Sequence, residues 1–318
     1  MMPNTYTPGT PSKVHETQPS KYQALDLTQD QISQIAGTLT RTRPAYGPIM
    51  DFYSRVFGAQ AETRAAICPD PIIIEDDLLA LKRENDMPLI TPSQFKIDIK
   101  AAKKLMRAIC QLAVDHAPKL AQAGENLALC LDKTGAAESN LDLDHLFFDL
   151  LDGKDIQKTA DSCKISTEAL GFFGFSAMLP SIQACATQLD AYLKEKEQTD
   201  KGYCPICGSL PDLSILDDSG KKLVSCSLCS HIWPVKRMTC IFCDATGADT
   251  QHYFYSGEEP EYRVYCCDDC GHYLKTVDTR QLGRRFFPKL EQIATLHLDI
   301  KAKERGYRPP ETSGSIAP

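Results

Sequence analysis

The chain lacks an excess of positive charge and lacks a long apolar run. Its 35 Lys and Arg residues stand against 42 Asp and Glu residues, which gives a net charge of -7 and a pI near 5.6. General affinity for phosphate backbones relies on clustered cations, so nucleic acid is not an expected partner. No apolar run approaches the roughly 18 to 20 residues that span a bilayer, and the N-terminus shows no hydrophobic segment of the secretory kind. We therefore expect a cytoplasmic protein without membrane insertion.

Signatures of catalysis are also missing from the sequence. It contains no phosphate-binding loop, no G-x-S-x-G motif and no paired catalytic carboxylates. We therefore expect a protein that is not an enzyme.

The first half of the 318-residue chain has a helical pattern that predicts six to eight helices. "TPSQF" offers Thr91 or Ser93 as the N-cap of one of them. A second apolar pattern over residues 166–195 contains Pro180, which is expected to kink or split the helix. The apolar stripe after the predicted cap consists of Phe95, Ile99, Ala102, Met106, Ile109 and Ala113.

Cysteine is abundant, and nine of the 14 cysteines crowd into residues 204–270. Two C-x-x-C turns supply the four soft ligands that zinc or iron takes in tetrahedral sulfur coordination, so eight paired cysteines predict two metal ions per chain. A thioredoxin-type redox pair would need a surrounding βαβ pattern, which is not visible. The predicted ligands are Cys204, Cys207, Cys226, Cys229, Cys240, Cys243, Cys267 and Cys270.

Spacing favours sequential pairing of the four turns. Eighteen residues separate Cys207 from Cys226, and 23 separate Cys243 from Cys267. The first spacing lies within the roughly 15 to 20 residues expected of a zinc ribbon, and the second is slightly longer. The first two pairs are therefore expected to form one site and the last two pairs the other.

Each sequential site would contain one turn that ends in glycine, at Gly208 or Gly271, where positive φ is favourable. Nested pairing would instead give both glycines to one site. Cys266 adjoins Cys267 and is interpreted as an incidental neighbour of that ligand. The remaining cysteines have no paired spacing and are interpreted as structural filling; they are Cys68, Cys110, Cys130, Cys163 and Cys185.

The predicted fold is α+β, with an N-terminal all-helical domain, two tandem rubredoxin-like (zinc-ribbon) metal modules and a C-terminal helix. The β-branched pieces "KKLVSC", "QHYFYS" and "EYRVYC" suit the hairpins of such ribbons. The charged stretch 194–202 is the expected linker. The predicted divisions are a disordered tail over 1–20, the helical domain over 21–197, the metal-binding region over 203–280, and a C-terminal helix and tail over 281–318.

The stretches "CPICGSLP", "CSLCSHIWPVKRMTC" and "CDDCGHYLK" resemble the formate dehydrogenase accessory protein FdhE family. The resemblance implies an assembly factor that binds the catalytic subunit of a molybdenum- or tungsten-dependent formate dehydrogenase in the cytoplasm, without turnover of formate. It also suggests partner contacts, because aromatic and Arg residues are favoured as interface anchors. Packing around the ribbons is the alternative role of these residues, which are Trp233, Arg237, Tyr273 and Lys275.

Two other functions remain open from the residues alone. Rubredoxin-like electron transfer is one, because the glycine turns suit iron as well as zinc. A nucleic-acid-binding zinc ribbon is the less favoured one, since residues 203–280 contain seven Lys and Arg against eleven Asp and Glu. Homo-oligomerisation also stays open.

Overall fold

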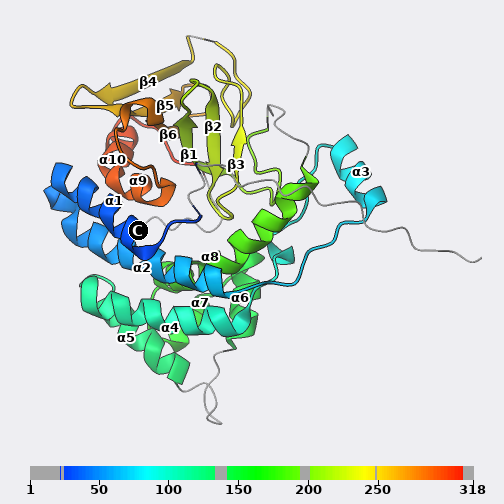
Figure 1. The fold of residues 1–318 in the computed structure, drawn as a ribbon, viewed down its shortest axis with the longest axis vertical. Coiled ribbons are helices and arrows are strands. Elements are labelled where there is room, and N and C mark those ends of the chain that lie inside the picture. Colours follow the sequence, from blue (N-terminus) through cyan, green and yellow to red (C-terminus); the bar gives the residue numbers. More distant parts are fainter. Residues whose placement is uncertain (1–21, 23–24, 133–141, 194–200, 248, 311–318) are drawn as a thin grey trace, which may run out of the picture.

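A computed structural model describes residues 22, 25–132, 142–193, 201–247 and 249–310. Helices form the lower part of the molecule in Figure 1, and a β-sheet forms the upper part. This mixture of an N-terminal helical part and a C-terminal sheet confirms the α+β class. The predicted tail 1–20, residues 194–200 of the predicted linker and residues 311–318 lie outside the described residues.

Eight α-helices precede the sheet in the described residues, which agrees with the six to eight predicted. They are α1 (Gln29–Thr42), α2 (Gly47–Ala66), α3 (Asp76–Glu84), α4 (Ile99–His116), α5 (Ala121–Asp132), α6 (Leu143–Leu151), α7 (Gln157–Ser162) and α8 (Thr167–Leu189). Short 3₁₀ turns lie at η1 (Pro44–Tyr46), η2 (Pro92–Gln94) and η3 (Asp190–Tyr192).

Helix α4 begins later than predicted. Its N-cap is Asp98, whose carboxylate accepts a hydrogen bond from the backbone N–H of Ala101 at 3.0 Å. Thr91 instead caps the short turn η2 through a capping box with Gln94. Two competing caps lie within eight residues, and the extended backbone of Phe95 after η2 prevents the earlier one from starting α4.

Helix α8 is not split at Pro180, contrary to one of the two predicted outcomes. A proline inside a helix leaves the carbonyl four residues earlier without its usual N–H donor. That carbonyl belongs to Ser176, and the side-chain amide of Gln60 on α2 donates a hydrogen bond to it at 2.8 Å. The side chain of Gln60 is buried, so a residue of a neighbouring helix replaces the missing backbone donor.

The helix formed by α8 and η3, Thr167–Tyr192, is long and apolar enough to cross a membrane by length and composition. This segment differs from the expectation that no apolar run approaches a membrane-spanning length. Its most apolar window is 72% buried inside the protein, and a buried core helix gives the same signal.

The sheet contains six strands in the order β3-β2-β1-β6-β5-β4. Strands β1 and β6 pair in parallel, and every other neighbouring pair is antiparallel. Two three-stranded ribbons therefore join at β1 and β6 into one continuous sheet. The strands are β1 (Pro211–Leu216), β2 (Lys222–Cys226), β3 (Ile232–Pro234), β4 (Gln251–Ser256), β5 (Glu259–Cys267) and β6 (Tyr273–Asp278).

The single predicted C-terminal helix is two helices, α9 (Pro288–Ala294) and α10 (Leu296–Glu304), after the short turn η4 (Thr279–Gln281). The chain bends between them at Thr295, whose hydroxyl donates to the carbonyl of Glu291 at 2.7 Å. Helix α9 contacts α1 and α2, and α10 contacts β6 (Figure 1). The two helices thus connect the sheet with the helical part.

The replacement of a backbone donor by Gln60 predicts a non-additive pair of substitutions. Gln60→Met leaves the buried Ser176 carbonyl without a donor, so the free energy of unfolding is expected to fall by about 2 kcal/mol. In a Pro180→Ala background the backbone N–H returns, and the same substitution is expected to cost less than half as much. Urea unfolding of the four proteins measures this, and equal costs in both backgrounds would contradict the proposed compensation.

Candidate metal centres

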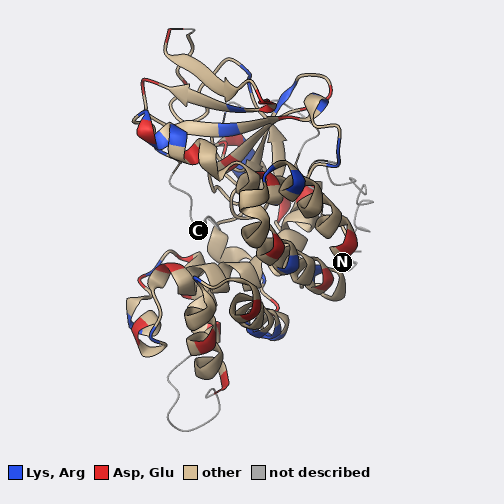
Figure 2. Ribbon diagram, turned by 90° about the vertical axis from the view of Figure 1, so that its left-hand side faces the viewer, with Lys and Arg blue, Asp and Glu red and all other residues tan. Residues whose placement is uncertain are grey.

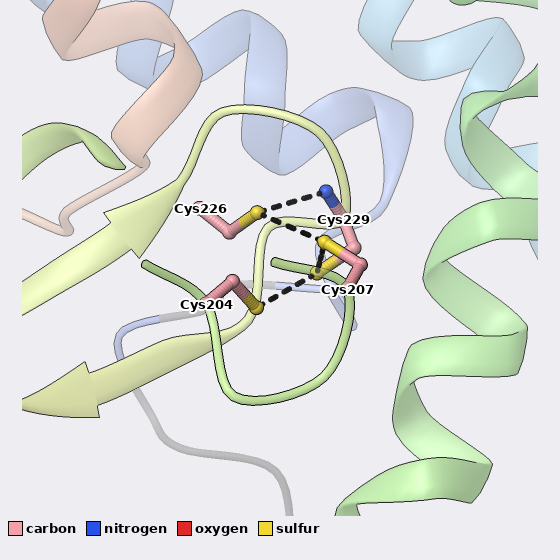
Figure 3. A group of neighbouring side chains, drawn as sticks. All are labelled: Cys204, Cys207, Cys226 and Cys229. Carbon is pink, nitrogen blue, oxygen red and sulfur yellow. Dashed lines mark hydrogen bonds between the residues drawn. The ribbon is translucent and has the colours of Figure 1, made fainter. Parts of the chain in front are cut away.

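Two loops bring the first four predicted ligands together. Cys204 and Cys207 lie on the loop before β1, Cys226 is the last residue of β2, and Cys229 lies on the turn between β2 and β3. Figure 3 shows the four side chains pointing toward one common centre. Each of them is at most 1% exposed. We call these four residues the inner group.

The second set of four comes from two loops of the other ribbon. Cys240 and Cys243 lie on the loop between β3 and β4, and Cys267 and Cys270 lie at the turn between β5 and β6. Cys243 is exposed and Cys270 is half-buried. We call these four residues the outer group. The grouping is the predicted sequential one, and nested pairing does not occur.

The sulfur separations suit a metal ion. The Sγ atoms of Cys204 and Cys229 lie 3.6 Å apart, as do those of Cys207 and Cys226. In the outer group the separations are 3.8 Å for Cys240 with Cys270 and 3.6 Å for Cys243 with Cys267. Metal–sulfur bonds of about 2.3 Å in a tetrahedron place sulfurs about 3.8 Å apart. Each group could therefore hold one metal ion.

All four C-x-x-C turns share one backbone geometry. In each, the N–H of the residue after the second cysteine donates to the carbonyl of the first cysteine, at 2.9 to 3.2 Å. The first cysteine's N–H donates to the carbonyl five residues later, at 2.8 to 3.0 Å. The residue after the second cysteine has positive φ in every turn, and these residues are Gly208 (77°), Ser230 (61°), Asp244 (58°) and Gly271 (69°).

Gly208 and Gly271 were the predicted glycine turns, whereas Ser230 and Asp244 were missed. Neither residue type identifies a left-handed position by itself, although Asp tolerates it better than most side chains. The signal that could have found these two positive φ angles is sequence position, because both residues directly follow a C-x-x-C pair.

The inner group needs a cation to hold four thiolates. Burial, reinforced by the neighbouring thiols, raises the pKa of Cys204 and Cys229 well above that of a free thiol. Hydrogen bonds from the same neighbours lower the pKa of Cys207. Its thiolate is therefore stabilised by the S–H protons of the neighbouring cysteines. Four thiolates at this site would require a cation in place of those protons.

Cys266 belongs to neither group. Successive residues of a strand point to opposite faces, so Cys267 reaches the outer group while Cys266 faces the core between the sheet and α10. Burial raises the pKa of the Cys266 thiol to about 12. Among the scattered cysteines, Cys110, Cys163 and Cys185 are buried as expected, Cys130 is half-buried, and Cys68 is exposed.

Three of the four predicted partner contacts are inside the protein. Trp233, Tyr273 and Lys275 are 2%, 3% and 5% exposed. The ammonium of Lys275 and the hydroxyl of Tyr273 both donate to Asp299 of α10, at 2.7 and 2.8 Å. These three residues therefore pack around the ribbons, which corrects the expectation of partner contacts there. Arg237 is the exposed member of the set.

The charges are interspersed. Lys and Arg alternate with Asp and Glu along the helices and strands in the view of Figure 2. Several cations near the sheet are paired, such as Arg280, whose guanidinium donates to the buried carboxylate of Asp278 at 2.7 Å. Among the described residues in this view, the cations do not gather on one face as they do in many nucleic-acid-binding proteins.

Comparison with known proteins gives two kinds of match. No family model matches the chain. The Protein FdhE homolog of Aquifex aeolicus is 35% identical over 147 residues, which are 45% of this chain and 50% of the relative. Protein FdhE of Escherichia coli is 34% identical over 113 residues, which are 33% of this chain and 34% of the relative. The chain thus spans half or less of the length of these curated relatives.

The structural match is longer. The crystal structure of the FdhE protein from Pseudomonas aeruginosa aligns with a TM-score of 0.58 and 20% identity, and covers 95% of this chain and 98% of that one. It shows that the two proteins share a fold.

The two groups predict the metal content. Purified protein is expected to hold two metal ions per chain, and Cys266→Ser is expected to keep both because its side chain faces the core. Cys270→Ser is expected to lose one. Elemental analysis of the three proteins measures this. A value near one ion for the unmodified protein, or loss of an ion from Cys266→Ser, would contradict the assignment.

The positive φ angles predict opposite effects of two substitutions in the outer group. Gly271→Ala is expected to lower the free energy of unfolding by about 1 kcal/mol, because a Cβ there meets no atom within 4 Å and the cost is conformational. Asp244→Gly removes a side chain from a left-handed position and is expected to stabilise by a few tenths of a kcal/mol. Thermal unfolding of metal-saturated protein tests both signs, and a fall in Tm for both variants would refute the argument.

Proposed function

We propose that this chain, which is similar in sequence to FdhE proteins and shares the fold of one of them, is an accessory protein for the maturation of a molybdenum- or tungsten-dependent formate dehydrogenase. In this role it binds the catalytic subunit of the dehydrogenase in the cytoplasm and does not itself turn over formate. The observation that carries the proposal is the pair of four-cysteine groups held by four matching turns in a chain similar to FdhE proteins.

The chemistry of the two groups supports a binding role. A metal ion with four cysteine ligands has no open coordination position for a substrate, and such ions usually stabilise a fold. Zinc or iron would be held by the eight thiolates and would supply rigidity to the turns. The residues of the chain then act through shape and contacts, and Arg237 is an exposed candidate contact on the loop between β3 and β4.

A rubredoxin-like electron-transfer role is the second candidate. The observation that favours it is that Cys243 is exposed and Cys270 only half-buried, which would place an iron ion within reach of a redox partner. A ferric tetrathiolate is coloured and bleaches on reduction, whereas a zinc site is colourless. Reversible bleaching of the purified protein would support this role.

Loss of the gene is expected to abolish formate dehydrogenase activity while the dehydrogenase transcript persists, because an assembly factor acts after synthesis. The purified protein is expected to capture the catalytic subunit with micromolar affinity, as a transient interface allows. Arg237→Ala is expected to weaken capture about tenfold without loss of metal. Lys236→Ala, its exposed neighbour, is the matched control.

Two results would contradict this function. Full dehydrogenase activity in the deletion strain would remove the need for an accessory protein. A fall in transcript together with a failure to capture the subunit would indicate a regulatory role instead.

A further inference from the structure

The two cysteine groups share their turn geometry but differ in access to solvent. All four inner cysteines are buried, whereas Cys243 is exposed and Cys270 is half-buried in the outer group. Cys240 and Cys267 are only 7% and 3% exposed. Solvent therefore reaches the outer group mainly at Cys243 and Cys270. The same coordination chemistry is therefore placed in two different environments.

The inner group is enclosed by the helical part of the protein. The backbone N–H groups of Leu89 and Ile90 donate to the carbonyls of Pro205 and Ile206, both at 2.9 Å, inside the first turn. The side chain of Gln183 on α8 donates to Ser230 in the second turn at 3.2 Å. The inner cysteines also belong to the same apolar core as the helices. A molecule that removes this ion must first separate the sheet from the helices.

The outer group is enclosed on one side. Its second turn is tied to the end of the chain, because the N–H of Arg308 donates to Gly271 and its carbonyl accepts from Tyr273, at 2.9 and 3.0 Å. The first turn, Cys240 to Asp244, carries the exposed ligand Cys243. A donor atom from solution would therefore reach the ion past Cys243 without any movement of the helices.

The surrounding sheet does not depend on the outer ion alone. Tyr262 on β5 donates to the buried carboxylate of Glu291 on α9 at 2.6 Å. Lys275 on β6 donates to Asp299 on α10 at 2.7 Å. These contacts attach β5 and β6 to α9 and α10 independently of the outer cysteines. Release of the outer ion is thus expected to open a surface turn while the sheet stays in place.

We propose that the outer group is an exchange site for a thiophilic divalent metal ion, which leaves and returns past Cys243, while the inner group keeps its ion permanently. The step is a ligand substitution. A nitrogen or sulfur donor of a small chelator or thiol bonds to the ion as the bond between the ion and the Cys243 sulfur breaks, and the oxidation state of the metal does not change. The inference rests on the two metal sites of the proposed function and does not depend on the client.

Metal release from the two-zinc protein tests the proposal. With excess 4-(2-pyridylazo)resorcinol under anaerobic conditions at neutral pH, one equivalent of zinc is expected to leave quickly. The second equivalent, from the inner group, is expected to leave roughly 100-fold more slowly, because its release requires the sheet and the helices to separate first. Pulsed labelling with N-ethylmaleimide and peptide mass mapping then identifies the site. Among the eight cysteines of the two groups, only those of the outer group should be labelled in the fast phase, and far-UV circular dichroism should stay unchanged.

Two variants test the assignment through zinc content as well as through the release kinetics. Cys243→Ser is expected to hold one zinc ion that leaves only in the slow phase. Cys68→Ser, which removes an exposed cysteine outside both groups, is the matched control and should release zinc as the unmodified protein does. If Cys243→Ser fails to fold, the labelling of the unmodified protein still decides the question.

Equal release rates, or labelling of inner cysteines in the fast phase, would overturn the exchange site. Neither result involves the client, so the accessory role would still stand. Conversely, failure to capture a dehydrogenase subunit would leave the exchange site intact.

Discussion

The structure depends on the inner group of four cysteines, which lies where the helices meet the sheet. Its thiols are buried in the same apolar core as the helices, and the turns that carry them receive hydrogen bonds from Leu89 and Ile90. Four thiolates at such a position cannot be ionised together without a cation, because burial raises the pKa of Cys204 and Cys229. Metal binding at this site would therefore be coupled to assembly of the whole protein.

The second constraint is the parallel pairing of β1 and β6. Tandem ribbons could sit as separate modules, but here Ser214 pairs with Thr276 and Leu216 with Asp278, so both ribbons share one backbone hydrogen-bond network. Contacts from α9 and α10 reinforce the joint, and Arg43 after α1 forms an ion pair with Glu259 of β5 at 2.5 Å. The two ribbons and the helices are therefore joined by one continuous set of backbone hydrogen bonds and side-chain contacts.

Local patterns in the sequence predicted how the eight paired cysteines are grouped, since C-x-x-C spacing is a short-range property that directly specifies a turn. They also predicted helices and the strand pieces of β2, β4 and β5. The failures at Pro180 and at three of the expected partner contacts involve residues far apart in the chain. Pro180 does not split α8 because Gln60 lies beside it, and Trp233, Tyr273 and Lys275 are buried by elements that follow or precede them by many residues. No sequence window contains both members of such contacts.

The difference between the two groups follows from which ribbon the helices cover. The ribbon with the inner group packs against the helical core, so an ion held there would be protected by the same surfaces that stabilise the fold. The ribbon with the outer group extends beyond that core and is anchored by polar contacts to α9 and α10. Because Glu291 and Asp299 hold its strands without any sulfur ligand, the fold can tolerate an open outer turn. Two cysteine groups built from the same kind of turn can thus serve two purposes, one as a structural joint and one as an accessible metal site, through their difference in burial.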